Sequence, residues 1–145
     1  MVLVDTSAWI FALKKSPFIP LKEKIDLLLR EGLVLTFGMI KLELLGGTKS
    51  KKEFNRLKNR LDALYEVPAD QSLWNKASEL AFILHRKGIT VPYTDILIAS
   101  AALCSKATLL HIDIHFDLIV KQTELKAESF ISLIQCKEKQ GLQKD

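Results

Sequence analysis

The chain opens with Val2-Leu3-Val4-Asp5-Thr6-Ser7-Ala8-Trp9-Ile10, and this stretch decides the fold. Three consecutive apolar residues at 2–4 are typical of a short strand that is buried on both faces. The run ends at Asp5, after which Thr6 or Ser7 can cap a helix that continues to Leu13. A buried strand that passes directly into a helix is the first half of a βαβ unit, and it predicts a parallel sheet.

The same alternation continues along the chain. Further short apolar runs, which predict strands, lie at 33–35, 64–67, 108–112 and 130–134. Helical periodicity is found at 21–29, 39–45, 54–64, 73–84 and 95–105. Pro20 fits a first helical position, Thr94 an N-cap, and Gly32 and Gly88 the position just beyond a helix end. The expected fold is α/β, with a central parallel sheet of four or five strands flanked by helices on both faces.

Composition supports one compact domain. The 145 residues are 48% hydrophobic and 26% charged, with a net charge of +4, which excludes a disordered chain. We expect a single domain over 1–136, followed by a polar, frayed tail over 137–145. Two cysteines are too few for a disulfide scaffold, and no signal peptide or membrane-spanning run is visible. These features predict a cytoplasmic protein.

The positive charge is concentrated in one predicted helix. Six basic residues and one acidic residue lie between Thr48 and Arg60. Lys52, Arg56 and Arg60 follow one another at helical spacing, and we call these three residues the cationic stripe. Such a stripe is typical of a polyanion-binding surface, although most are simply solvated helix faces.

Four acidic residues are placed near one end of the expected sheet. Asp5 and Asp113 follow predicted strands, Asp95 lies in the first turn of a helix, and Glu43 lies in the helix after the second strand. Asp5 and Asp95 could be helix caps, Asp113 a turn residue, and Glu43 a surface residue. If they face one cavity, however, their charges repel one another unless a cation neutralises them. An all-oxygen site of this kind suits Mg²⁺ or Mn²⁺.

Four sequence motifs, taken in their order along the chain, resemble those of the PIN-domain family, specifically its VapC-like toxins. They lie at 2–10, 39–47, 88–102 and 109–116. The resemblance implies a PIN-like fold and an endoribonuclease, dependent on Mg²⁺ or Mn²⁺, that belongs to a toxin–antitoxin pair.

The resemblance also implies roles for the acidic residues. Asp5 and Asp95 would be the principal metal ligands, and Asp113 would complete the site. Glu43 would bind a second ion or orient the attacking water, and Thr6 or Ser7 would support Asp5 through a hydroxyl group.

Two positions depart from the family pattern. His111 replaces the usual Ser or Thr, and His115 replaces an acidic or small polar residue. Either could be a metal ligand or contact the scissile phosphate, but a surface imidazole is the expected role.

The family also implies protein partners. An antitoxin would occupy an apolar groove formed by the early helices, for which Trp9, Phe11 and the 21–29 helix are candidates, and these surfaces could also form a homodimer. Two alternatives remain open: a PIN nuclease that acts in RNA processing without a toxin role, and a catalytically weak module that binds RNA through the cationic stripe.

Overall fold

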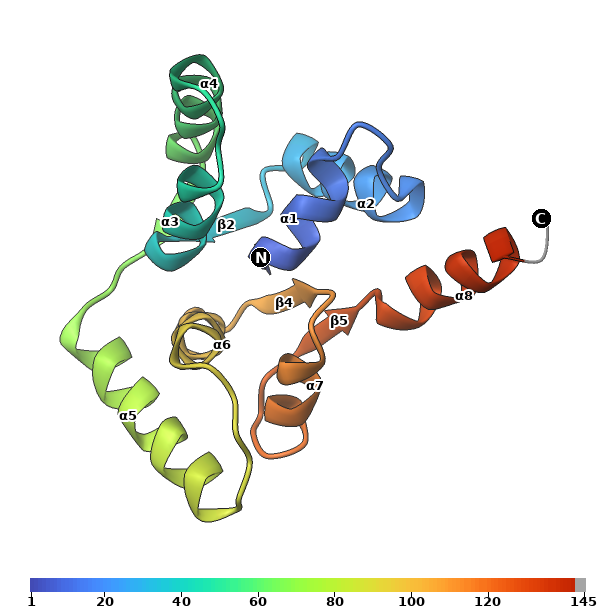
Figure 1. Cartoon of the computed structure of the whole chain (residues 1–145). Helices are drawn as coiled ribbons and strands as arrows, with labels where there is room; N and C mark the ends of the chain where they lie inside the picture. The colour runs from blue at the N-terminus through green and yellow to red at the C-terminus, as the bar shows by residue number, and fades with distance from the viewer. Residues whose placement is uncertain (143–145) are drawn as a thin grey trace.

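The computed structural model describes residues 1–142, which form a five-stranded sheet surrounded by helices (Figure 1). The strands are β1 (Val2–Val4), β2 (Val34–Phe37), β3 (Tyr65–Val67), β4 (Thr108–His111) and β5 (Ala127–Ser129). Their order is β3-β2-β1-β4-β5, and every pairing is parallel. In the central register, Val2 lies between Val34 and Thr108. The predicted α/β class and parallel sheet are therefore confirmed.

Within the described part of the chain, seven helices lie between these strands and an eighth follows the last one. They are α1 (Thr6–Leu13), α2 (Ile19–Arg30), α3 (Gly38–Gly46), α4 (Lys51–Asp62), α5 (Gln71–Arg86), α6 (Tyr93–Ser105), α7 (Ile114–Val120) and α8 (Ile131–Leu142). Helices α1 and α2 lie on one side of the sheet, and α5, α6 and α7 lie on the other (Figure 1). No helix within residues 1–142 is both long and apolar enough to cross a membrane.

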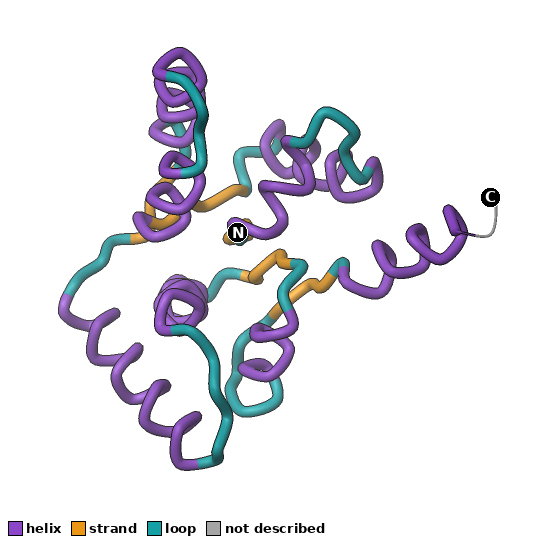
Figure 2. Tube along the Cα trace, in the orientation of Figure 1, coloured by secondary structure: helices purple, strands orange, loops and turns teal. Residues whose placement is uncertain are grey.

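Three central strands pass into helices with almost no intervening loop (Figure 2). One residue, Asp5, separates β1 from α1, and β2 continues directly into α3. Two residues, Ile112 and Asp113, separate β4 from α7. Because the strands are parallel, these junctions meet at the carboxyl edge of the sheet, where α/β proteins bind their ligands.

The two strands that carry Asp5 and Asp113 at their carboxyl ends lie in the centre of the core. Leu3 and Val4 of β1 and Leu109 and Leu110 of β4 are fully buried, as continuous apolar strands between two helical layers require. The expected helix ends at Gly32 and Gly88 are confirmed, since both glycines have positive φ angles, of 66° and 69°.

Three sequence predictions about local structure need correction, and one helix was missed. The run at 130–134 is not a strand. Phe130 and Ile134 are one helical turn apart and bury one face at the start of α8, and β5 precedes them. Residues 137–142, expected as a frayed tail, continue α8, and 143–145 lie outside the described residues. Thr94 is inside α6, whose N-cap is Pro92. Helix α7 was not predicted.

Candidate functional site

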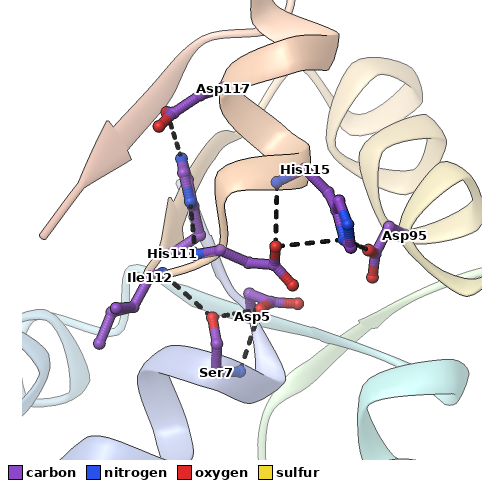
Figure 3. Close-up of polar contacts among 8 residues, drawn as sticks. Asp5, Ser7, Asp95, His111, Ile112, His115 and Asp117 are labelled. Carbon is purple, nitrogen blue, oxygen red and sulfur yellow. Dashed lines mark hydrogen bonds and ion pairs between the residues drawn. The ribbon is translucent and has the colours of Figure 1, made fainter. Parts of the chain in front are cut away.

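The four acidic residues meet at the carboxyl edge of the sheet. Asp5 lies at the β1–α1 junction and Asp113 at the β4–α7 junction, while Glu43 comes from α3 and Asp95 from the first turn of α6. Figure 3 shows Asp5 and Asp95 facing the same space. The structure thus brings together the whole set that the sequence suggested.

Asp5 is both a helix cap and a buried carboxylate. It is 3% exposed and is the N-cap of α1, so the expected cap by Thr6 or Ser7 is wrong. Its Oδ2 accepts hydrogen bonds from the Ser7 backbone N–H at 3.0 Å and from Ser7 Oγ at 2.5 Å. Ser7 Oγ in turn accepts from the Ile112 backbone N–H at 3.0 Å (Figure 3). Ser7 therefore joins the two strand–helix junctions that carry Asp5 and Asp113.

Thr6 serves a different acid. Its hydroxyl donates to Glu43 Oε1 at 3.0 Å, which fixes the side chain of an otherwise exposed residue at the rim of the site. The sequence left open which of the two hydroxyl groups supports Asp5. In the structure Ser7 orients Asp5, and Thr6 orients Glu43.

His115 lies between Asp95 and Asp113. Its Nδ1 is 2.8 Å from Asp95 Oδ2 and 3.2 Å from Asp113 Oδ1 (Figure 3). Asp113 also caps α7, because its Oδ1 accepts from the His115 backbone N–H at 2.9 Å. The expectation of a surface imidazole is therefore wrong for His115, which is part of the acidic site. Sequence spacing could not reveal this, because α7 was not predicted.

His111 is likewise not a surface residue. The side chain is completely buried and packs against Phe116, with ring centroids 5.2 Å apart. Its Nδ1 accepts a hydrogen bond from the Asp113 backbone N–H at 3.1 Å, so the proton of the neutral ring resides on Nε2, 3.5 Å from Asp117 Oδ1. Burial lowers the pKa of His111 and favours this neutral form. His111 therefore supports the backbone of Asp113 from behind the site.

Electrostatics show that the acids share one environment. Burial raises the pKa of Asp5, of Asp95 and, to the extent that it is covered, of Glu43. Repulsion adds to this effect: the charges of Asp95 and Asp113 raise the pKa of Glu43, and those of Asp113 and Asp5 raise the pKa of Asp95. Ser7 and Thr6 act in the opposite direction, because their hydrogen bonds favour the ionised carboxylates.

The donor set fits a divalent cation. Asp95, Asp113 and His115 each offer one ligand atom, and these atoms lie within 4.8 Å of one another. Among residues 1–142, no lysine or arginine lies within ion-pair distance of any of the four acids. A compact group of carboxylates, of which Asp5 and Asp95 are buried, can be neutralised by a bound metal ion when no lysine or arginine pairs with it.

The cationic stripe lies elsewhere, on the exposed side of α4. Only Arg60 of its three residues lines a groove, of about 500 Å³, between α1, α2 and α4. The groove is mostly apolar, and its other lining residues are Trp9, Ala12, Leu13, Lys22, Ile25, Asp26, Leu29, Leu57, Leu61, Ala63 and Leu64. Of the predicted groove residues, Trp9 and part of the 21–29 helix are present, whereas Phe11 is not among the lining residues.

Comparisons with known proteins agree with this geometry. No protein-family model matches the chain. VapC ribonuclease Mb1587 of Mycobacterium bovis is 30% identical over 133 residues, which cover 90% of this chain and 99% of that protein. Ribonuclease VapC11 of Mycobacterium tuberculosis matches to the same extent. The crystal structure of VapBC2 from Rickettsia felis, bound to a promoter DNA fragment, superimposes with a TM-score of 0.74 at 25% identity, covering 89% of this chain and 98% of that one. The chain therefore belongs to the VapC ribonuclease family, and its fold is that of a PIN domain.

Proposed function

We propose that this protein is a metal-dependent endoribonuclease and the toxin of a VapBC-type toxin–antitoxin pair. The observation that carries the proposal is the convergence of Asp5, Glu43, Asp95 and Asp113 at the carboxyl edge of a parallel sheet. Family membership supports the same conclusion, since the similar curated proteins are VapC ribonucleases. Such an enzyme would act in the cytoplasm, on RNA.

The cofactor of this proposal is Mg²⁺ or Mn²⁺. Asp5, Asp95 and Asp113 would hold the ion. Asp5 and Asp95 are buried, and the charges of Asp113 and Asp5 raise the pKa of Asp95, which supports a shared site. A bound divalent ion supplies Lewis-acid polarisation of the phosphate and a lowered pKa for water.

The remaining polar side chains prepare the site for hydrolysis. Ser7 favours the ionised form of Asp5 that ligation requires, and His111 fixes the backbone at Asp113. Glu43 would orient the attacking water, because Thr6 holds one of its carboxylate oxygens at the rim of the site. The raised pKa of Glu43 also makes this carboxylate a better proton acceptor. The water would give a proton to Glu43 and attack the phosphorus atom, the P–O bond to the leaving oxygen would break, and that oxygen would take up a proton from solvent.

The antitoxin would bind the groove between α1, α2 and α4. Its apolar lining, with Trp9 and Ile25 on one side and Leu57 and Leu61 on the other, suits the apolar face of an amphipathic helix. The Rickettsia felis relative is the VapBC2 assembly, and its similarity to this chain supports such a partner. Arg60 at the groove would favour an acidic side chain on the bound segment. A homodimer remains part of the proposal by resemblance to the family.

The experiment is cleavage of a mixed pool of structured RNAs by the purified chain, in Mg²⁺ or Mn²⁺ and in EDTA. An Asp5→Asn, Asp95→Asn double variant, purified identically, controls for contaminating ribonuclease. We expect metal-dependent cleavage by the wild-type protein and none by the variant. Equal activity of the two proteins would contradict the proposal.

A second experiment tests the toxin role. We expect growth arrest when the wild-type chain is expressed without its antitoxin, and none with the double variant. Cleavage in vitro without growth arrest would favour a nuclease that acts in RNA processing. RNA binding that survives EDTA, without cleavage, would favour a binding module.

A further inference from the structure

The imidazole of His115 occupies a place among carboxylates. Helix α7 begins directly after Asp113, and its capping hydrogen bond, from the His115 backbone N–H to Asp113 Oδ1, brings the histidine back over that carboxylate. The side chain is about one-third exposed, and its Nδ1 is directed at Asp95 and Asp113 (Figure 3). This nitrogen is held from two sides by acids that come from α6 and from the β4–α7 junction.

The spacing of these atoms matches neighbouring ligands of one ion. Two ligands on adjacent corners of an octahedron, with bonds of about 2.1 Å, lie about 3.0 Å apart. His115 Nδ1 is 2.8 Å from Asp95 Oδ2 and 3.2 Å from Asp113 Oδ1, and all three ligand atoms lie within 4.8 Å of one another. The nitrogen is therefore at ligand spacing from each oxygen, and an ion bound to all three atoms would also require the two oxygens to lie no more than about 4.2 Å apart.

We propose that His115 is a direct ligand of the divalent ion and that it makes the site prefer Mn²⁺ to Mg²⁺. Mg²⁺ strongly prefers oxygen ligands and gives up its water reluctantly, whereas imidazole nitrogen is a good ligand for first-row transition ions. Replacing one oxygen ligand by a nitrogen thus disfavours Mg²⁺ relative to Mn²⁺. This inference rests on the proposed function, because it requires that the acidic residues hold a cation.

The direction of the ring argues against the other roles open to His115. Nδ1 is turned toward Asp95 and Asp113, so a contact with the scissile phosphate could come only from Nε2, whereas Nδ1 is the nitrogen placed to bind an ion. A neutral imidazole that ligates through Nδ1 keeps its proton on Nε2, so the same residue can bind the ion without carrying a positive charge.

The test is electron paramagnetic resonance of Mn²⁺ added to the full chain, with electron spin-echo measurement of coupling to ¹⁴N. The chain has three histidines, so the nitrogen can be assigned by substitution. We expect nitrogen coupling in the wild-type protein and in His85→Gln, whose histidine lies on the exposed surface of α5. We expect no coupling in His115→Asp, which retains a metal-binding side chain.

Competition between the two ions gives a second readout. We expect the ratio of the Mg²⁺ Kd to the Mn²⁺ Kd to fall at least about tenfold in His115→Asp, a loss in the range seen for disturbed metal sites. The wild-type spectrum needs no variant to fold: Mn²⁺ bound without nitrogen coupling would overturn the inference and leave the proposed function intact. Coupling that persists in His115→Asp would also overturn it. Absence of Mn²⁺ binding to the wild-type chain would overturn the metal site itself.

Discussion

Replacing Ser7 by alanine removes the hydroxyl that connects the two halves of the site. The substitution deletes the 2.5 Å bond to Asp5 Oδ2 and the acceptor of the Ile112 N–H, 3.0 Å away. A hydrogen bond to a charged group contributes about 1.5–3 kcal/mol, and a buried donor without a partner costs about 1–3 kcal/mol. Because Ser7 is only half-buried, water recovers part of the second loss. We therefore expect a total loss of about 2–4 kcal/mol in the free energy of unfolding.

Urea unfolding at pH 7 measures this loss, and a thermal scan should show a decrease in Tm of about 6–12 °C for a chain of this length. Ser78→Ala is the matched control, because Ser78 Oγ bonds only to the Trp74 carbonyl on an exposed helix face. We expect this control to change stability by less than about 0.5 kcal/mol. If Ser7→Ala destabilises the protein no more than Ser78→Ala does, the linking role of Ser7 is refuted.

The same variant should change the pH dependence of RNA cleavage. Ser7 lowers the pKa of Asp5 against the effect of burial, so its loss raises that pKa further. Asp5 would then ionise, and bind metal, only at higher pH. We expect the acid limb of the cleavage profile to move to higher pH in Ser7→Ala, and an unchanged limb would contradict the assignment of Asp5 as a ligand.

Three other predictions concern charge and backbone. Folding raises the pKa of Glu43 above its ordinary value of 4.5, so the folded metal-free protein favours the protonated form. Its free energy of unfolding should therefore fall as pH rises from about 4.5 through the raised pKa. In urea unfolding with EDTA, Glu43→Gln should show a smaller fall over the same pH range. Changing all three residues of the cationic stripe to alanine should weaken RNA binding. In binding titrations at several salt concentrations, the slope of the logarithm of the association constant against the logarithm of salt concentration should become shallower by about 2. An unchanged slope would show that the stripe does not contact RNA. Gly88→Ala should lower the free energy of unfolding by about 1 kcal/mol, because Gly88 has a φ of +69° although no atom would clash with an added methyl group. Gly46→Ala should leave it unchanged, because Gly46 lies at a helix end without positive φ. Equal urea midpoints for the two variants would contradict this reasoning.

The central sheet was predictable because β1, β2 and β4 each contain a short apolar run, and helices were expected directly after the first two. The edge strand β5 was not predictable, since its sequence, Ala127–Ser129, lacks an apolar run and the buried Phe130 that follows it packs at the start of α8. Helix α7 has seven residues, too few for helical periodicity to stand out, and its start depends on the cap by Asp113.

The meeting of Asp5 and Asp113 was predictable from topology, because residues that directly follow parallel strands lie at one edge of the sheet. Asp95 and Glu43 lie within helices α6 and α3, so the strands alone do not place them. What the sequence could not supply is the pairing of side chains. Whether Thr6 or Ser7 orients Asp5 depends on the turn that follows β1, and the positions of the two histidines depend on α7. His111 and His115 are four residues apart, yet one is buried behind the site and the other lies among its acids.

The most direct test of the account compares two aspartates that each face a histidine. Asp95 belongs to the acidic site, whereas Asp117 faces the buried His111. In Mn²⁺, we expect Asp95→Asn to lower single-turnover RNA cleavage by at least about a thousandfold, as removal of a ligand from a metal-dependent site should, and Asp117→Asn to retain activity within about tenfold of wild type. Equal activity of the two variants would contradict the claim that the carboxylates at the sheet edge form the catalytic centre.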